Sequence, residues 1–184
     1  MLSSVTGGKS EFETKLRQVS WPEPYQCRKD KQKGIEIDIE KRIAKGVIQR
    51  VSSPEDAYVS NICTREKQDG SPRVILDFKN LNKNIIYHHF KMDSSQTATD
   101  LMKTDCYMAT IDWKDAYNCL PVGQCDRKFL AFQWKNQIYQ YTCLTNGLAS
   151  APRTFTKISK VLFSQLRKKR TCKHGLHRRF PVDS

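Results

Sequence analysis

The stretch Ile111-Asp112-Trp113-Lys114-Asp115-Ala116-Tyr117 is the most informative part of this 184-residue sequence. Residues 107–112 alternate between two faces, which is typical of a half-buried β-strand. A strand that ends in Asp112 places this carboxylate at a sheet edge facing solvent, where it can bind a hard cation such as Mg²⁺. If a helix starts after Asp112, its backbone N–H groups can also hold phosphate oxygens. The alternative interpretation is that Asp112 only caps a helix.

Two further stretches have the composition of a phosphate-binding site. Residues 65–73 are predicted to form a hairpin tip with several cations, and Lys and Arg bind phosphate groups. Residues 144–152 place Gly147 and several small residues before a helix, which leaves room for a ligand to approach the backbone. The alternatives are a solvated hairpin and a plain junction between a loop and a helix.

Strands and helices alternate irregularly with hairpins, so the sequence predicts an α+β fold. Residues 1–34 are polar and are expected to form an extended or loosely ordered lead-in. Helices are expected from residue 35 to a C-terminal cap at Gly46, over 93–102 and over 151–166. The apolar stripe of the last helix is predicted to consist of Phe155, Ile158, Val161, Leu162 and Leu166. Strands are expected over residues 47–51, 58–65, 73–78, 107–112, 129–134 and 138–142.

The composition restricts the environment and the partners of the chain. It has 32 Lys and Arg against 19 Asp and Glu, a net charge of +13, which favours a polyanionic partner such as nucleic acid. No apolar run approaches the roughly 20 residues of a membrane span, and residues 1–9 lack the apolar stretch of a signal peptide. The seven cysteines form no Cys-x-x-Cys pair. We therefore expect an intracellular protein, cytoplasmic or nuclear, that has reduced thiols and is neither secreted nor inserted into a membrane.

The order of these motifs resembles the fingers and the first part of the palm of a reverse transcriptase. The basic hairpin is followed by residues 75–82, then by the 112–117 stretch and by the Asn146-Gly147 stretch, so that the resemblance covers about residues 35–169. It implies a right-hand polymerase whose incomplete palm is a ferredoxin-like antiparallel sheet with helices on one face. It also implies template-directed DNA synthesis from dNTPs on an RNA or DNA primer–template. Residues 88–92 and 146–149 are most similar to the DIRS-type (tyrosine-recombinase) retrotransposons.

The resemblance implies a role for each residue that matches a family motif. Asp112 matches the first catalytic aspartate, a ligand of both Mg²⁺ ions in two-metal phosphoryl transfer. Tyr117 matches the aromatic gate that excludes a ribose 2′-OH and thereby selects dNTPs. The other matched residues contact the incoming nucleotide: Lys67, Arg73, Asp115, Ala116, Asn146 and Gly147. Two positions depart from the pattern, since Thr145 replaces a usual proline and Pro72 replaces an aromatic residue that often precedes the arginine.

The sequence after the last predicted helix lacks the Tyr-x-Asp-Asp hairpin that supplies the remaining metal-binding carboxylates of the family. Residues 170–184 form a basic tail instead. Its Cys172, His174 and His177 are zinc-binding residue types, but their spacing is too tight for a known finger and a fourth ligand is absent. Codons compatible with residues 174–181 encode Met-Gly-Tyr-Ile-Asp-Asp-Ser when they are read one base later. We therefore interpret the tail as a frameshifted remnant.

The sequence thus predicts a reverse transcriptase fragment that keeps Asp112 but is inactive as translated, because its partner aspartates are missing. One alternative is a noncatalytic nucleic-acid-binding remnant that keeps only a basic surface. A second is a relic that does not fold, because a truncated palm sheet exposes an unpaired edge. The tail has four basic residues and one acid, which account for +3 of the net charge and leave +10 for residues 1–169. This remaining charge suits a fragment that binds a phosphate backbone.

Overall fold

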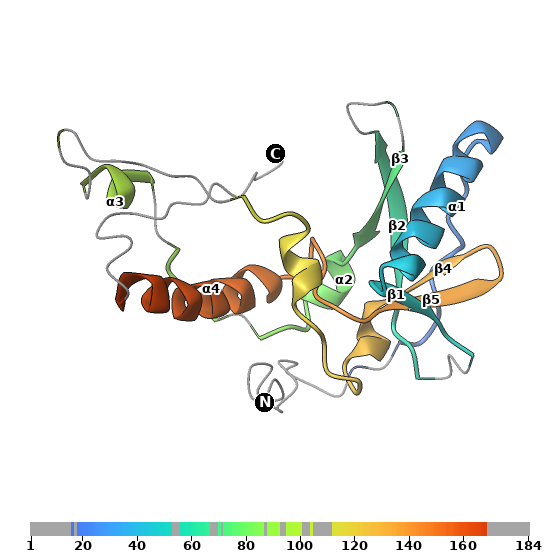
Figure 1. Cartoon of the computed structure of the whole chain (residues 1–184). Coiled ribbons are helices and arrows are strands. Elements are labelled where there is room, and N and C mark those ends of the chain that lie inside the picture. Colours follow the sequence, from blue (N-terminus) through green and yellow to red (C-terminus); the bar gives the residue numbers. More distant parts are fainter. Residues whose placement is uncertain are drawn as a thin grey trace. The chain divides into compact units, whose positions relative to one another are not determined.

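The computed structural model describes residues 16, 18–52, 56–66, 70, 72–86, 88–92, 95–100, 104 and 112–168. The chain divides into two compact units, Met1–Tyr87 with Tyr117–Ala151 and His88–Ala116 with Pro152–Ser184. Its elements, labelled in Figure 1, are α1 (Lys29–Ala44), β1 (Ile48–Arg50), β2 (Val59–Glu66), β3 (Pro72–Asp77), α2 (Lys79–Asn82), α3 (Ser95–Asp100), η1 (Ala116–Cys119), η2 (Arg127–Leu130), β4 (Ala131–Trp134), β5 (Gln137–Tyr141) and α4 (Ala151–Lys168).

The first unit is built on a five-stranded sheet with the strand order β1-β5-β4-β2-β3. The hairpins β2–β3 and β4–β5 and the pair β1–β5 are antiparallel, whereas β2 and β4 run parallel, with Val59 opposite Ala131. The described strands therefore form a mixed sheet. The antiparallel ferredoxin-like sheet was expected for the palm, whose predicted strand 107–112 lies almost entirely outside the described residues, so it stays a prediction. The two hairpins were predictable from their alternation, but a local pattern does not specify how separate hairpins join edge to edge.

Helix α1 packs against the sheet through its apolar face. Ile35 and Ile39 are fully buried, and Gly46 ends the helix with a φ of +68°, as the sequence predicted. The helix begins at Lys29, however, inside the segment that was expected to be a lead-in. Residues 29–34 are almost entirely polar, so the apolar periodicity that predicts a helix starts only after them.

The described residues of the segment before α1 are held against the first unit by side-chain contacts. The Gln18 side-chain amide accepts a hydrogen bond from the Val59 N–H at 2.7 Å and donates one to the Val59 carbonyl at 2.9 Å. The hydroxyl groups of Tyr25 and Thr64 lie 2.9 Å apart. Leu16, Tyr25 and Cys27 also pack against the apolar core. These contacts fasten the segment to β2.

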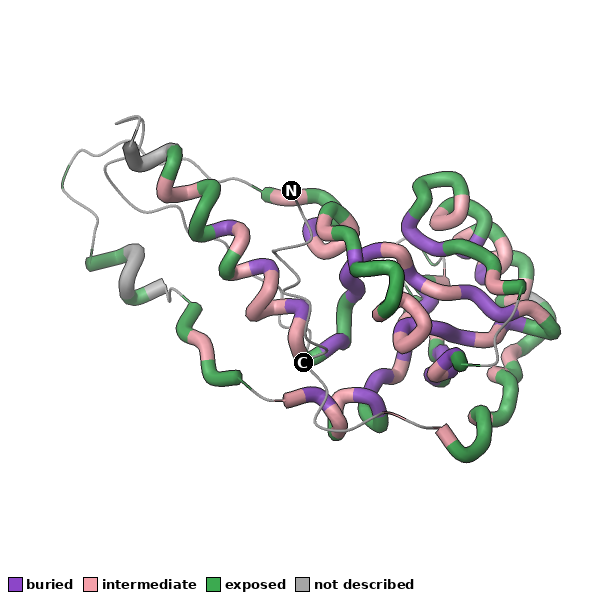
Figure 2. Tube along the Cα trace, turned by 90° about the horizontal axis from the view of Figure 1, so that it is seen from below, coloured by how far each residue is buried: buried purple, intermediate pink, exposed green. Residues whose placement is uncertain are grey.

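The apolar core of the first unit lies between α1 and the sheet. Figure 2 colours the trace by burial, and the largest fully buried side chains include Tyr141, Phe78 and Phe132. A smaller apolar cluster contains Val59, Ala131 and Ile138. Because neighbouring residues of a strand point to opposite faces, this second cluster lies on the other face of the sheet. The sheet is therefore apolar on both sides.

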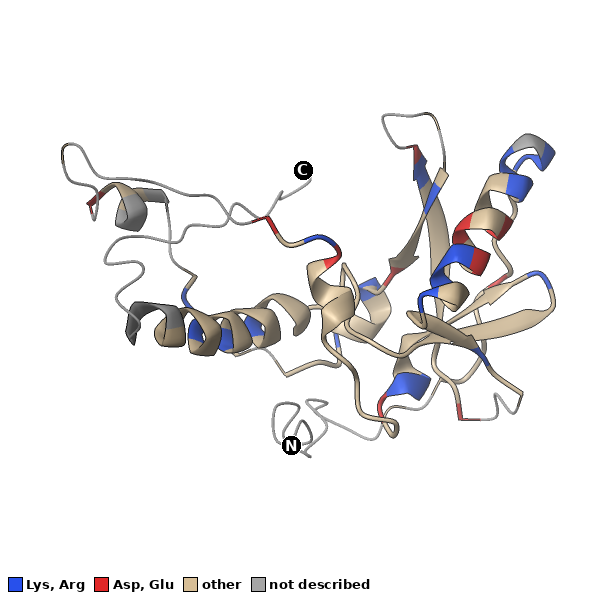
Figure 3. Cartoon of the chain, in the orientation of Figure 1, with Lys and Arg blue, Asp and Glu red and all other residues tan. Residues whose placement is uncertain are grey.

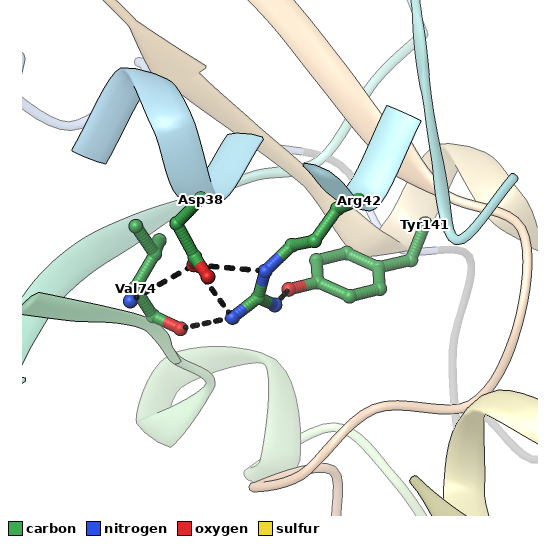
Figure 4. A network of polar contacts seen from close by, with 4 residues as sticks. All are labelled: Asp38, Arg42, Val74 and Tyr141. Carbon is green, nitrogen blue, oxygen red and sulfur yellow. Dashed lines mark hydrogen bonds and ion pairs between the residues drawn. The ribbon is translucent and has the colours of Figure 1, made fainter. Parts of the chain in front are cut away.

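A polar network, drawn in Figure 4, links α1 to strands β3 and β5. The Arg42 guanidinium forms an ion pair with Asp38 at 2.9 Å and donates a hydrogen bond to the Val74 carbonyl at 3.0 Å. It also donates to the Tyr141 hydroxyl and lies 5.9 Å from the centre of that ring. One side chain thus satisfies polar groups from three elements at the border of the core.

The second unit contains α3, α4 and residues 112–115. The edge of the Trp113 ring meets Phe155 of α4, with ring centres 5.6 Å apart. Helix α4 begins at Ala151 with Pro152 in its first turn, as predicted. Its expected apolar stripe is only partly buried, because Val161 and Leu162 are 61% and 43% exposed.

The remaining sequence-based expectations for this unit lie outside the described residues in part. They concern residues 107–111 of the predicted strand, residues 93–94 and 101–102 of the predicted helix, and the tail. In the part of the chain that the structure describes, no helix combines the length and apolar character needed to cross a membrane.

Candidate nucleotide and nucleic-acid site

Asp112 is exposed and lies in an irregular segment of the second unit. The chain then turns at Asp115, whose φ of +51° is in the left-handed region that Asp tolerates better than most residues. A helix after Asp112 was considered as a phosphate-binding element, and the structure has there a short 3₁₀ helix, η1. Ala116 at its start is buried, while Asp115 is exposed.

The described residues do not form a two-metal site. No group of three or more His, Cys, Asp or Glu side chains that could hold a metal ion occurs among them. Two Mg²⁺ ions about 4 Å apart require several bridging and neutralising carboxylates, and Asp112 supplies only one. The predicted role of Asp112 as a metal ligand therefore stays a prediction.

The β2–β3 hairpin presents two arginines side by side. Arg73 of β3 lies directly opposite Arg65 of β2 in the antiparallel register, and both are exposed. Neither makes an ion pair within the described residues. Like charges in directly opposed positions repel each other, so this arrangement is stabilised when an anion binds between them. Figure 3 shows the basic residues on these strands. Lys67 lies outside the described residues.

Gly147 lies close to the end of β3. Its φ is +90°, a conformation that favours glycine, and a Cβ atom at this position would lie 3.5 Å from the Phe78 ring. The Asn82 side chain donates a hydrogen bond to the Gly147 carbonyl at 2.8 Å and accepts one from the Ala149 N–H at 2.9 Å. The structure therefore brings together two stretches that are far apart in sequence, 75–82 and 146–149.

Tyr117, the predicted aromatic gate, is half-buried and packs against the core of the first unit. Its carbonyl accepts a hydrogen bond from the Leu120 N–H at 3.0 Å, which closes the turn of η1. The Tyr117 side chain is thus held by contacts with the core, and its backbone is held within the turn of η1.

The two departures from the family pattern have structural surroundings of their own. Pro72 contacts α1 at Gly34, where any side chain would overlap the proline ring. Thr145 is buried, and its hydroxyl donates a long hydrogen bond to the Asn146 carbonyl at 3.5 Å. Pro72 therefore fits the contact with α1, and the Thr145 side chain lies inside the loop before Asn146.

The predicted site residues are divided between the two units. Arg73, Tyr117 and the Asn146-Gly147 turn belong to the first, and 112–116 belong to the second. Sequence reasoning did not single out two residues that the structure connects to them. Arg65 could have been found from strand register, because it lies within the predicted hairpin, whereas the long-range contact of Asn82 left no local signal.

The model of the family described as "Reverse transcriptase (RNA-dependent DNA polymerase)" matches residues 65–177, more than half of the chain. The chain belongs to the reverse transcriptase family. The matched residues include the tip of the β2–β3 hairpin with all of β3, Asp112 and the Asn146-Gly147 turn. The resemblance inferred from the motifs is confirmed at the level of the family.

Individual relatives agree with this family. The Transposon Tf2-3 polyprotein of Schizosaccharomyces pombe is 23% identical over 148 residues, which are 79% of this chain and 11% of the polyprotein. The Tf2-7 polyprotein of the same organism is 21% identical over 160 residues, 85% of this chain and 12% of the polyprotein. This reverse transcriptase chain thus spans about a tenth of the length of these curated relatives.

Solved structures support the fold. The foamy viral protease-reverse transcriptase in complex with dsDNA is similar with a TM-score of 0.72 and 21% identity, over 84% of this chain and 32% of that chain. The native Prototype Foamy Virus protease-reverse transcriptase has a TM-score of 0.65 and 19% identity, over 80% of this chain and 19% of that chain. The mixed five-stranded sheet is therefore part of a reverse transcriptase fold.

Proposed function

We propose that this chain is the fingers and the first part of the palm of a retrotransposon reverse transcriptase, and that it binds primer–template without extending it. In this proposal the five-stranded first unit corresponds to the fingers, and Asp112 and α4 belong to the palm. The observation that carries the binding role is the exposed Arg65–Arg73 pair on the β2–β3 hairpin. Such a pair suits phosphate groups of a nucleic acid or of an incoming dNTP.

Further basic residues support the same role. Helix α4 contains no acidic residue, and its basic residues Arg153, Lys157 and Lys160 recur at helical spacing. Figure 3 shows basic positions along this helix. Together with the net charge of +13, they supply the sequence-independent attraction that dominates affinity for a nucleic-acid backbone. The foamy viral relative in complex with dsDNA supports nucleic acid as the partner.

The absence of extension follows from the set of carboxylates. Asp112 has the position of the first catalytic aspartate, but the 184 residues contain no Tyr-x-Asp-Asp string. A single aspartate does not neutralise and bridge two divalent cations. In this proposal, Asp112 is a Mg²⁺ ligand of the parental enzyme, Lys67 and Asp115 belong to its nucleotide pocket, and residues 170–184 are a frameshifted remnant. A genomic sequence whose shifted frame does not encode Tyr-Ile-Asp-Asp would contradict the last point.

The binding role is tested with the full chain and a fluorescent DNA primer annealed to an RNA template. We expect binding that weakens steeply with salt, and no added nucleotide in the presence of dNTPs and Mg²⁺. Arg73→Gln should weaken binding and reduce the slope of log K against log salt by about one. Arg50→Gln is a matched control, since Arg50 is an exposed strand arginine that is paired with Glu40.

The outcomes separate the parts of the proposal. Binding that does not respond to salt, or equal effects of Arg73→Gln and Arg50→Gln, would contradict the role of the hairpin. Mg²⁺-dependent incorporation of nucleotides would contradict the proposed lack of polymerase activity and would show that the chain is an enzyme.

We also propose that the parental element is of the DIRS type and that the chain is intracellular. The first point rests on residues 88–92 and 146–149, and a tyrosine-recombinase gene in the same element would support it. The second rests on the cysteine pattern. Localisation of a tagged chain in the secretory pathway would contradict it.

A further inference from the structure

Asn82 connects two parts of the chain that lie far apart in sequence. It is the last residue of α2, and its side-chain amide bonds to Gly147 and Ala149, which follow it by 65 and 67 positions. One bond is donated by the Asn82 Nδ2 atom to a carbonyl, and the other is accepted by its Oδ1 atom from an N–H group. The amide thus satisfies one backbone acceptor and one backbone donor of the same turn, as a paired strand would.

The geometry of the turn depends on these two bonds. Gly147 has a φ of +90°, and its neighbours on the β3 side are the Phe78 ring and the Leu76 carbonyl, both in ordinary contact distance of a virtual Cβ atom. These contacts limit how close the turn lies to β3, but they are not directional. The two Asn82 bonds fix the orientation of the peptide groups on either side of Leu148.

Asn146 is the residue whose position this orientation determines. It precedes Gly147 and is exposed, and its side chain makes no hydrogen bond to another described residue. When the backbone of a residue is fixed and its terminal polar group makes no bond within the protein, that group is available to a ligand.

We propose that Asn82 is a positioning residue that presents the Asn146 side chain and the Gly147 backbone to the incoming nucleotide. This inference rests on the proposed function, because it assumes that the turn faces a nucleotide. Asn82 itself contacts the turn and not the ligand. Its amide converts a flexible glycine turn into a preorganised one, which reduces the ordering cost of binding.

The structural half of this proposal is tested by amide hydrogen exchange at Ala149. Asn82→Ala removes the acceptor of the Ala149 N–H, and exchange at this amide should become at least about fivefold faster. Asn82→Asp keeps an oxygen acceptor, so the Ala149 amide should stay protected while the bond to the Gly147 carbonyl is lost. Unchanged exchange in Asn82→Ala would overturn the proposal.

Asn80→Ala is the matched control for this measurement. Asn80 is an exposed asparagine of the same helix, and among the described residues its side chain accepts one hydrogen bond, from Lys83 at 3.4 Å. Exchange at Ala149 should not change in this variant. A thermal melt of each variant shows whether the first unit remains folded, and an increase in exchange that spreads over β2 and β3 would indicate general loosening and overturn the specific role.

The functional half is tested by the coupling between Asn82 and Asn146. The readout is the affinity of a hairpin DNA primer–template together with the complementary dNTP and Mg²⁺, with the primer–template alone measured in parallel. Asn82→Ala and Asn146→Ala should each weaken the ternary complex at least about threefold, and the double variant should be little weaker than either, because both changes remove the same contact.

Fully additive effects would assign Asn82 a structural role only and overturn the positioning role. If the unaltered chain binds neither primer–template nor dNTP, the proposed function fails, and the nucleotide role of Asn82 fails with it. The exchange experiment would still show in that case whether Asn82 holds the turn. The two failures are therefore distinguishable.

Discussion

The Arg42 network makes the stability of the first unit depend on one guanidinium. We expect Arg42→Leu to lower the free energy of unfolding by about 2–4 kcal/mol, because it leaves several partly buried polar groups without their partner. These groups are the Asp38 carboxylate, the Val74 carbonyl and the Tyr141 hydroxyl. The Asp38 side chain is only 14% exposed, so water restores little of the lost solvation. Its other contact is a long one, from the Val74 N–H at 3.4 Å.

This magnitude lies below the cost of breaking a fully buried ion pair, because Arg42 is still 21% exposed. The second variant, Asp38→Asn with Arg42→Leu, should recover about 1 kcal/mol of the loss, since the uncompensated charge is removed. A double-mutant cycle over the two positions isolates the pairwise energy.

The assay is urea unfolding followed by tryptophan fluorescence, for which Trp134 is a buried probe in β4. Arg50→Leu provides the matched control. Arg50 also pairs with an acid of α1 at 2.9 Å, but both side chains are about 60% exposed, and such pairs contribute roughly 0–1 kcal/mol. Equal unfolding energies for Arg42→Leu and Arg50→Leu would refute the reasoning.

Three further predictions concern the same unit. Burial raises the pKa of Tyr141 above its ordinary value of 10.0, so the folded state retains the phenolic proton to a higher pH than the unfolded state. Stability should therefore fall as the pH rises above about 10, and Tyr141→Phe should reduce this fall in thermal melts at alkaline pH. Burial likewise raises the pKa of Cys143 from 9.0 to about 11; a thiol reagent at pH 8 should modify it at least about 100-fold more slowly than the exposed Cys63, and comparable rates would show that the core opens readily. Gly34→Ala should destabilise the chain by about 1–3 kcal/mol, despite the better helix propensity of alanine, because the new methyl group overlaps the ring of Pro72; the additional change Pro72→Ala should restore stability in the same unfolding assay.

The sequence predicted best what is encoded by local periodicity. The hairpins β2–β3 and β4–β5 follow from period-two alternation around turn residues, and the start of α4 follows from Pro152 after small residues. The early start of α1 was missed because Lys29–Gly34 form a polar helical segment. The parallel pairing of β2 with β4 was missed because it joins residues more than 70 positions apart in sequence, where no turn fixes the register.

The site shows the same division between local and long-range information. Arg73, Asp112 and Gly147 were predicted from motifs, since each has the residue type that its chemistry requires. Asn82 was quoted only as part of a motif, because an asparagine at the end of a short helix has many local uses. Its two bonds to the Gly147 turn are a property of the folded chain and not of either segment alone.

In the proposed function, this division explains how nucleic-acid binding persists in a chain without the full set of catalytic carboxylates. The Arg65–Arg73 pair and the Asn146-Gly147 turn belong to the first unit. This unit has an apolar core, a segment before α1 that is bound to β2 through Gln18, and a polar network around Arg42. Their positions depend on packing within that unit, so the loss of acids elsewhere does not disturb them. Asp112 belongs to the other unit, where it is exposed and where α4 leaves Val161 and Leu162 in solvent. Binding through the basic hairpin requires one unit to fold, whereas two-metal catalysis requires carboxylates from several segments to converge. In the proposed function, substitutions or frameshifts in the second unit therefore abolish extension before they weaken binding.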